Sequence, residues 1–127
     1  MAYMNVGRGH IATHDFLERC ARDSVGVVFV GECWVERRRG RGTQLHPDYV
    51  RLVSLSKAHR VTSYVLQSMV DASSLVECAN RFVCLEIEGV QIGGVYGHYG
   101  ERVYDMERWL EGICEVVGVG HWVLLGD

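Results

Sequence analysis

The sequence predicts an α/β fold in which two β-sheets pack on each other and helices lie outside them. Two observations predict it. A strand, a helix and a strand come first, followed by a run of antiparallel-looking strands and then by a second helix and strand. The chain has 127 residues, of which 48% are hydrophobic and 23% charged. This is enough for one domain with a real core but not for two.

The first part of the chain is predicted to form a β-α-β unit. Residues 2–6 (AYMNV) are a short strand candidate that precedes a glycine-bearing turn. Residues 10–25 are expected to be helical, because four apolar residues fall on one stripe at helical spacing. These residues are Phe16, Leu17, Cys20 and Ala21. Residues 26–33 (GVVFVGEC) form a continuous apolar run, which is typical of a strand buried on both faces.

The middle of the chain changes to short strands. Residues 35–48 read as a polar loop with a basic run. Residues 49–56 alternate between apolar and polar positions, and residues 60–69 are rich in β-branched side chains, so both are predicted strands. Residues 74–78 are a weaker strand candidate.

The clearest hairpin is predicted over residues 81–100. Val83, Leu85 and Ile87 are expected on one face of its first strand, and the Glu-Gly pair at 88–89 supplies the turn.

A second helix is predicted over 101–118 and a last strand over 121–127. Five apolar residues of the helix step by three and four along one face: Val103, Met106, Leu110, Ile113 and Val117. The last strand runs directly into Asp127. Globular domains seldom stop at the tip of an apolar strand, so we expect the chain to be the N-terminal portion of a larger domain.

Composition excludes several classes of protein. No apolar run approaches the roughly 18 residues of a membrane span, and no signal peptide is evident, so an intracellular protein is expected. Five cysteines without CxxC spacing indicate reduced thiols rather than a disulfide framework or a zinc site. The six histidines show no paired metal-binding spacing. A net charge of −3 argues against a wholly basic nucleic-acid coat protein but allows a local basic patch.

Four polar residues lie at or just beyond the ends of predicted strands: Asn5, Glu32, Tyr96 and Asp127. Ligand sites on α/β scaffolds gather at strand ends. Two carboxylates there are suited to a hard divalent cation. From spacing alone a plainer alternative stays open, in which Glu32 is a strand-end acid that faces solvent or pairs with an arginine.

Four segments, in order, resemble the endonuclease/exonuclease/phosphatase superfamily: YMNVGRG, VVFVGECW, GGVYGHYG and WVLLGD. Members carry an Asn, a Glu, a Tyr and a Gly-Asp-x-Asn motif at these strand ends, and Asn5, Glu32, Tyr96 and Asp127 match them in turn. The segment from Glu32 to residue 69 resembles more closely the endonuclease domain of non-LTR retrotransposons, especially of fungal-type elements. The matching residues there are Glu32, Trp34, Thr43, His46, Pro47, Tyr49, Arg60, Val61, Tyr64 and Val65.

The resemblance implies a DNase I-like two-sheet α/β sandwich, truncated to about its first half over residues 1–127. It implies a metal-dependent DNA endonuclease whose nick primes reverse transcription. Glu32 would ligate Mg²⁺ (or Mn²⁺), and Asp127 would position or deprotonate the attacking water. Asn5 would orient metal-bound or phosphate oxygens, and Tyr96 would donate to a phosphate oxygen. The implied partner is DNA, in the nucleus for a functional retrotransposon protein, with no membrane, disulfide partner or small-molecule ligand expected.

Departures from the family pattern lead us to expect an inactive fragment. The Asn after the Gly-Asp pair and the C-terminal Asp-His pair have no counterpart. Cys33 replaces the usual proline, and Tyr3 replaces a usual glutamine. Two alternatives stay open, a non-catalytic degenerate relic and a phosphatase-like protein acting on a small phosphoester.

A basic run follows Glu32 closely and contains Arg37, Arg38, Arg39 and Arg41. Clustered arginines supply non-specific DNA affinity. The run favours a nucleic-acid substrate over a small phosphoester, although a solvated basic loop is the plainer interpretation.

Overall fold

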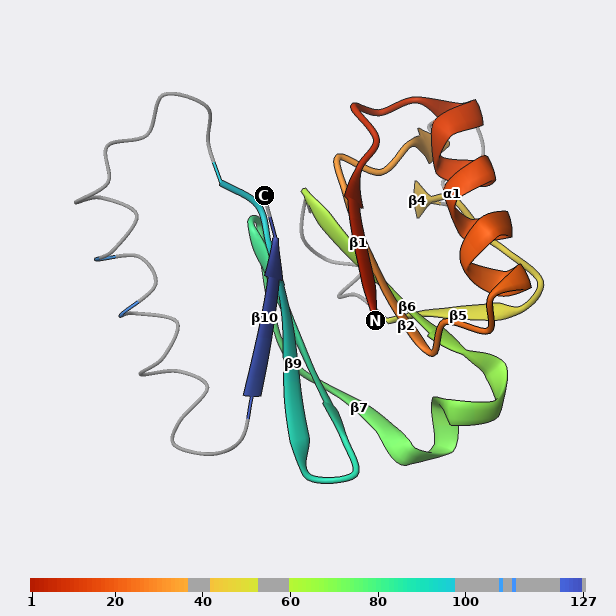
Figure 1. Ribbon diagram of the computed structural model, residues 1–127. Coiled ribbons are helices and arrows are strands. Elements are labelled where there is room, and N and C mark those ends of the chain that lie inside the picture. Colours follow the sequence, from red (N-terminus) through yellow and green to blue (C-terminus); the bar gives the residue numbers. More distant parts are fainter. Residues whose placement is uncertain (37–41, 53–59, 98–107, 109–110, 112–121, 127) are drawn as a thin grey trace.

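The described elements form two four-stranded sheets that face each other, with helix α1 (His10–Arg22) on the outer side of the first sheet (Figure 1). This confirms the predicted α/β sandwich. The computed structural model describes residues 1–36, 42–52, 60–97, 108, 111 and 122–126. Within that part of the chain, no helix has the length and apolar character needed to cross a membrane.

The first sheet has the strand order β1-β2-β6-β5. Its strands are β1 (Ala2–Asn5), β2 (Val27–Gly31), β6 (Val61–Leu66) and β5 (Tyr49–Leu52). Strands β1 and β2 run parallel and are joined by α1, so the predicted β-α-β unit is confirmed.

Helix α1 ends three residues earlier than the sequence pattern predicts. Ser24 adopts a left-handed backbone with φ of 53°, and the amide of Val25 donates to the carbonyl of Cys20 at 2.9 Å. A left-handed residue with such a bond terminates a helix by satisfying its last carbonyls. Glycine usually occupies this left-handed position, so a serine there gives no sequence signal that the helix ends.

Strand β2 is buried on both faces, as predicted. Val27 and Phe29 enter the core between the two sheets, whereas Val28 and Val30 pack with residues of α1. All four side chains are at most 2% exposed. The strand therefore packs on the second sheet with one face and on α1 with the other. This packing fixes the position of the residue that follows it.

The second sheet has the strand order β10-β9-β8-β7. Its strands are β7 (Ser73–Ala79), β8 (Phe82–Ile87), β9 (Val90–Val95) and β10 (Trp122–Gly126). Strands β8 and β9 form the predicted hairpin, in which Glu88 and Gly89 have φ of 51° and 79°. Two positive φ values at a two-residue loop define the hairpin turn that matches strand twist.

The core between the sheets depends on one close approach. A Cβ atom added at Gly94 would lie 2.6 Å from Cγ of Phe29 and closer still to Cδ1. Phe29 is 0% exposed, so its ring has no free space to move into. A glycine at this position of β9 therefore sets how near the two sheets come.

Two predicted segments differ in detail. The polar loop contains a short ladder between β3 (Val35–Glu36) and β4 (Gly42–Thr43). The strand predicted over 60–69 ends at Leu66 and gives way to the 3₁₀ helix η1 (Gln67–Ala72), because Met69 and Val70 turn onto the core.

Two more predicted segments lie partly outside the description. Strand β5 covers the first four residues of the 49–56 prediction, and 53–56 lie outside the described residues. The helix predicted over 101–118 also lies outside them, apart from Arg108 and Glu111, which are helical.

The cysteines in the described part of the chain are buried: Cys20, Cys33, Cys78 and Cys84. Burial raises the pKa of the Cys33 thiol, and burial with nearby carboxylates raises the pKa of Cys84 to about 11. These two thiols are therefore protonated at neutral pH and behave as small apolar side chains.

Candidate active site at the strand ends

Two of the predicted site residues meet because parallel strands end at the same edge of a sheet. Asn5, the last residue of β1, is the register partner of Gly31, the last residue of β2. Glu32 follows Gly31 directly. The ladder continues past the strand ends, since the amide of Val6 donates to the carbonyl of Gly31 at 3.0 Å. Asn5 and Glu32 are therefore neighbours.

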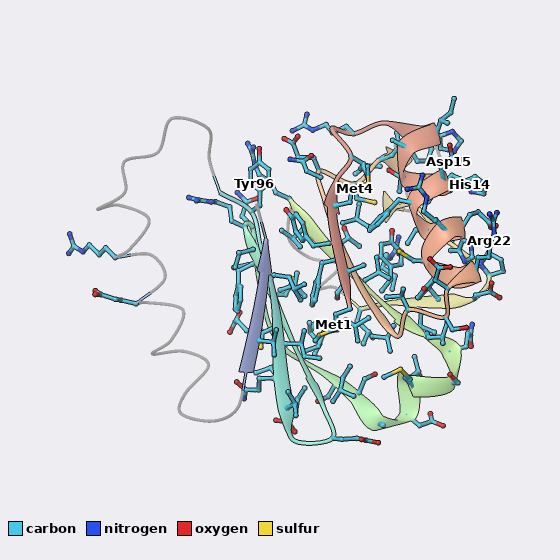
Figure 2. All side chains as sticks on the ribbon, in the orientation of Figure 1. Met1, Met4, His14, Asp15, Arg22 and Tyr96 are labelled. Carbon is cyan, nitrogen blue, oxygen red and sulfur yellow. The ribbon has the colours of Figure 1, made fainter. Side chains whose placement is uncertain are left out.

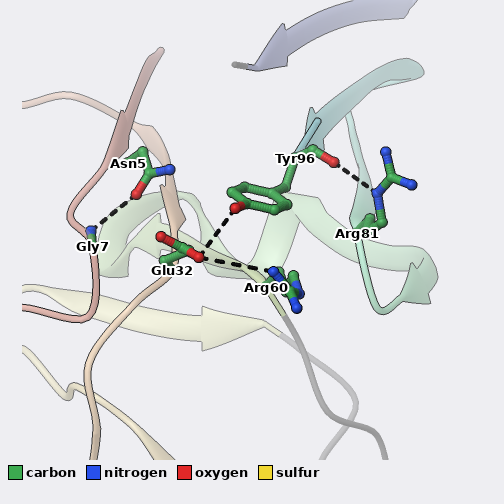
Figure 3. A network of polar contacts seen from close by, with 6 residues as sticks. All are labelled: Asn5, Gly7, Glu32, Arg60, Arg81 and Tyr96. Carbon is green, nitrogen blue, oxygen red and sulfur yellow. Dashed lines mark hydrogen bonds and ion pairs between the residues drawn. The ribbon is translucent and has the colours of Figure 1, made fainter. Parts of the chain in front are cut away.

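Tyr96 reaches the same place from the other sheet. It follows Val95 at the end of β9, and its hydroxyl donates to Oε1 of Glu32 at 3.1 Å (Figure 3). Its backbone is held on both sides by Arg81, whose carbonyl accepts from the Tyr96 amide at 2.9 Å and whose Nε donates to the Tyr96 carbonyl at 3.0 Å. The ring is thus pinned where it bridges the two sheets.

Glu32 has an unusual backbone conformation, which sets the direction in which its side chain leaves the chain. Its φ is 49°, in the left-handed region that non-glycine residues seldom adopt. Such a residue costs on the order of 1–3 kcal/mol and needs support from its surroundings. Here the Glu32 amide donates to the carbonyl of Arg60, and its carbonyl accepts from the amide of Arg8, both at 2.7 Å.

Asn5 is oriented by a turn of its own. Its Oδ1 accepts a hydrogen bond from the amide of Gly7 at 2.9 Å, and Gly7 has φ of 54° (Figure 3). An asparagine side chain that bonds the backbone two residues later mimics a backbone turn. This bond fixes the Asn5 amide beside Glu32.

Arg60 joins Asn5, Glu32 and Tyr96 at the site; it belongs to a matching sequence motif, but no role at the site was predicted for it. Its Nη1 lies 3.9 Å from Oε1 of Glu32, and its guanidinium carbon lies 5.5 Å from the centroid of the Tyr96 ring. The signal was in the strand register. Gly31 pairs with Val61 in the antiparallel β2–β6 ladder, so the residue before Val61 must lie beside the residue after Gly31. Glu32 therefore pairs with an arginine and also meets Asn5 and Tyr96.

Other predicted site residues lie outside the described residues: Asp127, Arg37, Arg38, Arg39 and Arg41. Strand β10 runs parallel to β9, with Gly126 as the register partner of Val95. The last described residue of β10 is thus level with the residue before Tyr96.

The donor set of the cluster is compatible with a hard cation. Glu32 supplies a carboxylate whose side chain is 22% exposed and so reachable from solvent. Carboxylate oxygens are the ligands that Mg²⁺ prefers. Within the described part of the chain, no three His, Cys, Asp or Glu side chains gather into a cation site. The described residues therefore supply one anionic ligand for such a cation, not a complete coordination sphere.

Comparison with known proteins bears on the fold. No protein-family model matches the chain, and no curated protein matches it. Among solved structures, the endonuclease domain of TRAS1, a telomere-specific non-LTR retrotransposon, superposes with a TM-score of 0.71 at 14% sequence identity. The match covers 98% of this chain and 56% of that one, so this chain spans little more than half of that structure. Over that span, the chain is similar in its two-sheet α/β fold to the endonuclease domain of a non-LTR retrotransposon.

Proposed function

We propose that this chain carries part of a site for cation-dependent hydrolysis of DNA phosphodiester bonds, as a retrotransposon-type endonuclease domain. One observation supports the proposal above the others. Asn5, Glu32 and Tyr96 come from the ends of three strands and converge on one point, and Tyr96 and Glu32 bond across 64 positions of sequence. The fold in which they converge is similar to that of an endonuclease domain.

Each residue has a role in the proposal that its geometry supports. Glu32 holds Mg²⁺ or Mn²⁺, which when bound polarises a phosphoryl oxygen and stabilises developing charge. Tyr96 donates a hydrogen bond from its hydroxyl to a phosphate oxygen in place of its bond to Glu32, because a donor within 3.1 Å of the carboxylate also reaches a group bound next to it. Asn5 orients the phosphate oxygens through its side-chain amide. We propose that Asp127 positions the attacking water.

Binding of Mn²⁺ tests the proposal without requiring turnover. A titration of the 127-residue chain, followed by the electron spin resonance signal of free Mn²⁺, is expected to show a site that Glu32→Gln weakens at least tenfold. Asp15→Asn is the matched control, because Asp15 is an exposed carboxylate on α1 (Figure 2). Equal Mn²⁺ binding by the wild type and Glu32→Gln would overturn the role of Glu32.

Nicking of supercoiled plasmid separates the possible activities. The expectation that this chain alone does not cleave DNA stays a prediction, and vigorous Mg²⁺-dependent nicking by the purified chain would contradict it while supporting the nuclease assignment. Hydrolysis of a small phosphomonoester without plasmid nicking would instead favour the phosphatase-like alternative.

A further inference from the structure

We infer that Arg60 contacts a backbone phosphate of DNA at this site, and that Glu32 holds its guanidinium in place before DNA binds. The identity of the ligand as DNA depends on the proposed function. The contact itself is argued from the surroundings of Arg60, and it assigns a substrate-binding role to a residue outside the proposed set of Asn5, Glu32, Tyr96 and Asp127.

The guanidinium of Arg60 has donors to spare. It carries five N–H groups. In the part of the chain that the structure describes, its ion-pair partner is Glu32, at an Nη1–Oε1 distance of 3.9 Å. A charge-assisted hydrogen bond to a carboxylate is typically about 2.7–2.9 Å long. The carboxylate thus attracts the guanidinium without saturating it, and the Arg60 side chain is 31% exposed to solvent.

The backbone of Arg60 is anchored between the two sheets. Its amide donates to the carbonyl of Asn80 at 2.6 Å, and its carbonyl accepts from the amide of Glu32 at 2.7 Å. Its guanidinium also lies over the Tyr96 ring (Figure 3). A side chain that is already held at its base and stacked on a ring loses less entropy when it binds a ligand.

The chemistry of the group matches a phosphodiester. A planar guanidinium binds phosphate oxygens with two parallel N–H bonds. The Tyr96 hydroxyl is a second donor close to the Arg60 guanidinium, since the hydroxyl and the guanidinium both lie near Oε1 of Glu32. Glu32 itself repels an anion unless a cation neutralises it, and Arg60 offsets that repulsion. The arrangement pairs an anion-binding group with a carboxylate suited to a cation.

Substitutions of Arg60 and Glu32 should have opposite effects on DNA binding when divalent cations are removed. Arg60→Gln deletes one phosphate contact, so the slope of log Kd against log salt falls by about 0.9. Glu32→Gln removes a carboxylate that both repels the phosphate and competes for Arg60; at an Nη1–Oε1 distance of 3.9 Å the lost orientation of the guanidinium is the smaller effect, so DNA binding should tighten by about two- to fivefold. The gain should be smaller in the double variant, because only the relief of direct repulsion between Glu32 and the phosphate remains once Arg60 is absent.

The experiment is fluorescence anisotropy of a short labelled DNA duplex over a salt series in EDTA. Arg22→Gln is the matched control, because Arg22 is exposed on α1, which covers the outer face of the first sheet, away from the face that Tyr96 approaches (Figure 2). We expect Arg22→Gln to keep the wild-type slope and Arg60→Lys to keep the slope with weaker binding. Equal slopes for Arg60→Gln and Arg22→Gln would overturn the inference.

Two further readouts keep the test decisive. If Arg60→Gln fails to fold by circular dichroism, Arg60→Lys and Glu32→Gln carry the test, and no tightening by Glu32→Gln overturns the inference. A wild-type chain that binds no DNA at low salt overturns it as well. A wild-type chain that binds no Mn²⁺ defeats the proposed function, while a changed salt slope for Arg60→Gln still supports the phosphate contact.

Discussion

Replacing Gly94 with alanine should weaken the fold and the site together. The added methyl group would lie 2.6 Å from Cγ of Phe29, well inside ordinary contact distance. Phe29 is 0% exposed in the core between the sheets, so either its ring leaves a favourable rotamer or the sheets move apart. Overpacking of this kind typically costs about 1–3 kcal/mol. For a chain of this size, the Tm should fall by roughly 4–12 °C.

Thermal and urea unfolding of the purified variant measure that cost. Phe29→Leu combined with Gly94→Ala is the matched control, because a smaller side chain makes room for the methyl group. The double variant should be more stable than the sum of the two single changes predicts. Additive losses, or a Gly94→Ala variant as stable as the wild type, would refute the steric argument. Gly94 lies two residues before Tyr96, so the variant should also bind Mn²⁺ more weakly.

Three other predictions concern stability. Burial raises the pKa of Tyr49 to about 12, from an ordinary value of 10, and its hydroxyl donates to the carbonyl of Val25. The folded state therefore disfavours the phenolate, and the free energy of unfolding should fall as pH rises between about 10 and 12, by up to about 1.4 kcal/mol per pH unit. Urea unfolding at each pH should show that Tyr49→Phe lacks this dependence on pH. His46 is buried and bonds Glu18 at 2.7 Å, so His46→Ala should cost about 1–3 kcal/mol by urea unfolding, and no loss would contradict the structural role. Gly89 has φ of 79° with no atom within 4 Å of an added Cβ, so Gly89→Ala should cost about 1 kcal/mol from backbone strain alone, whereas Gly89→Asn should cost less.

The parts of the fold that the sequence predicts well are those with a local signal. Alternating apolar residues and the Glu-Gly turn predict the β8–β9 hairpin, and the continuous apolar run predicts β2. The neighbourhood of Asn5 and Glu32 also follows locally, because a β-α-β unit brings the ends of its two strands together.

The parts that escape prediction depend on distant packing. The bond between Tyr96 and Glu32 exists only because two sheets face each other, and no pattern near either residue encodes their spacing. The place of Arg60 beside Glu32 was not predicted, although Arg60 belongs to a matching motif, because it depends on the register between β2 and β6. The early end of α1 depends on the left-handed backbone conformation of Ser24. The 3₁₀ helix η1 depends on the packing of Met69 and Val70 against the core.

We propose that a divalent cation binds at Glu32, between the ends of β1, β2 and β9. Nuclear magnetic resonance of the ¹⁵N-labelled chain with small additions of Mn²⁺ tests it most directly, because the ion broadens the amide signals nearest to it. We expect the signals of Asn5, Glu32 and Tyr96 to broaden first, and Glu32→Gln to abolish this selectivity. Broadening centred elsewhere, such as at Glu18 and His46, or spread evenly over the chain, would contradict it.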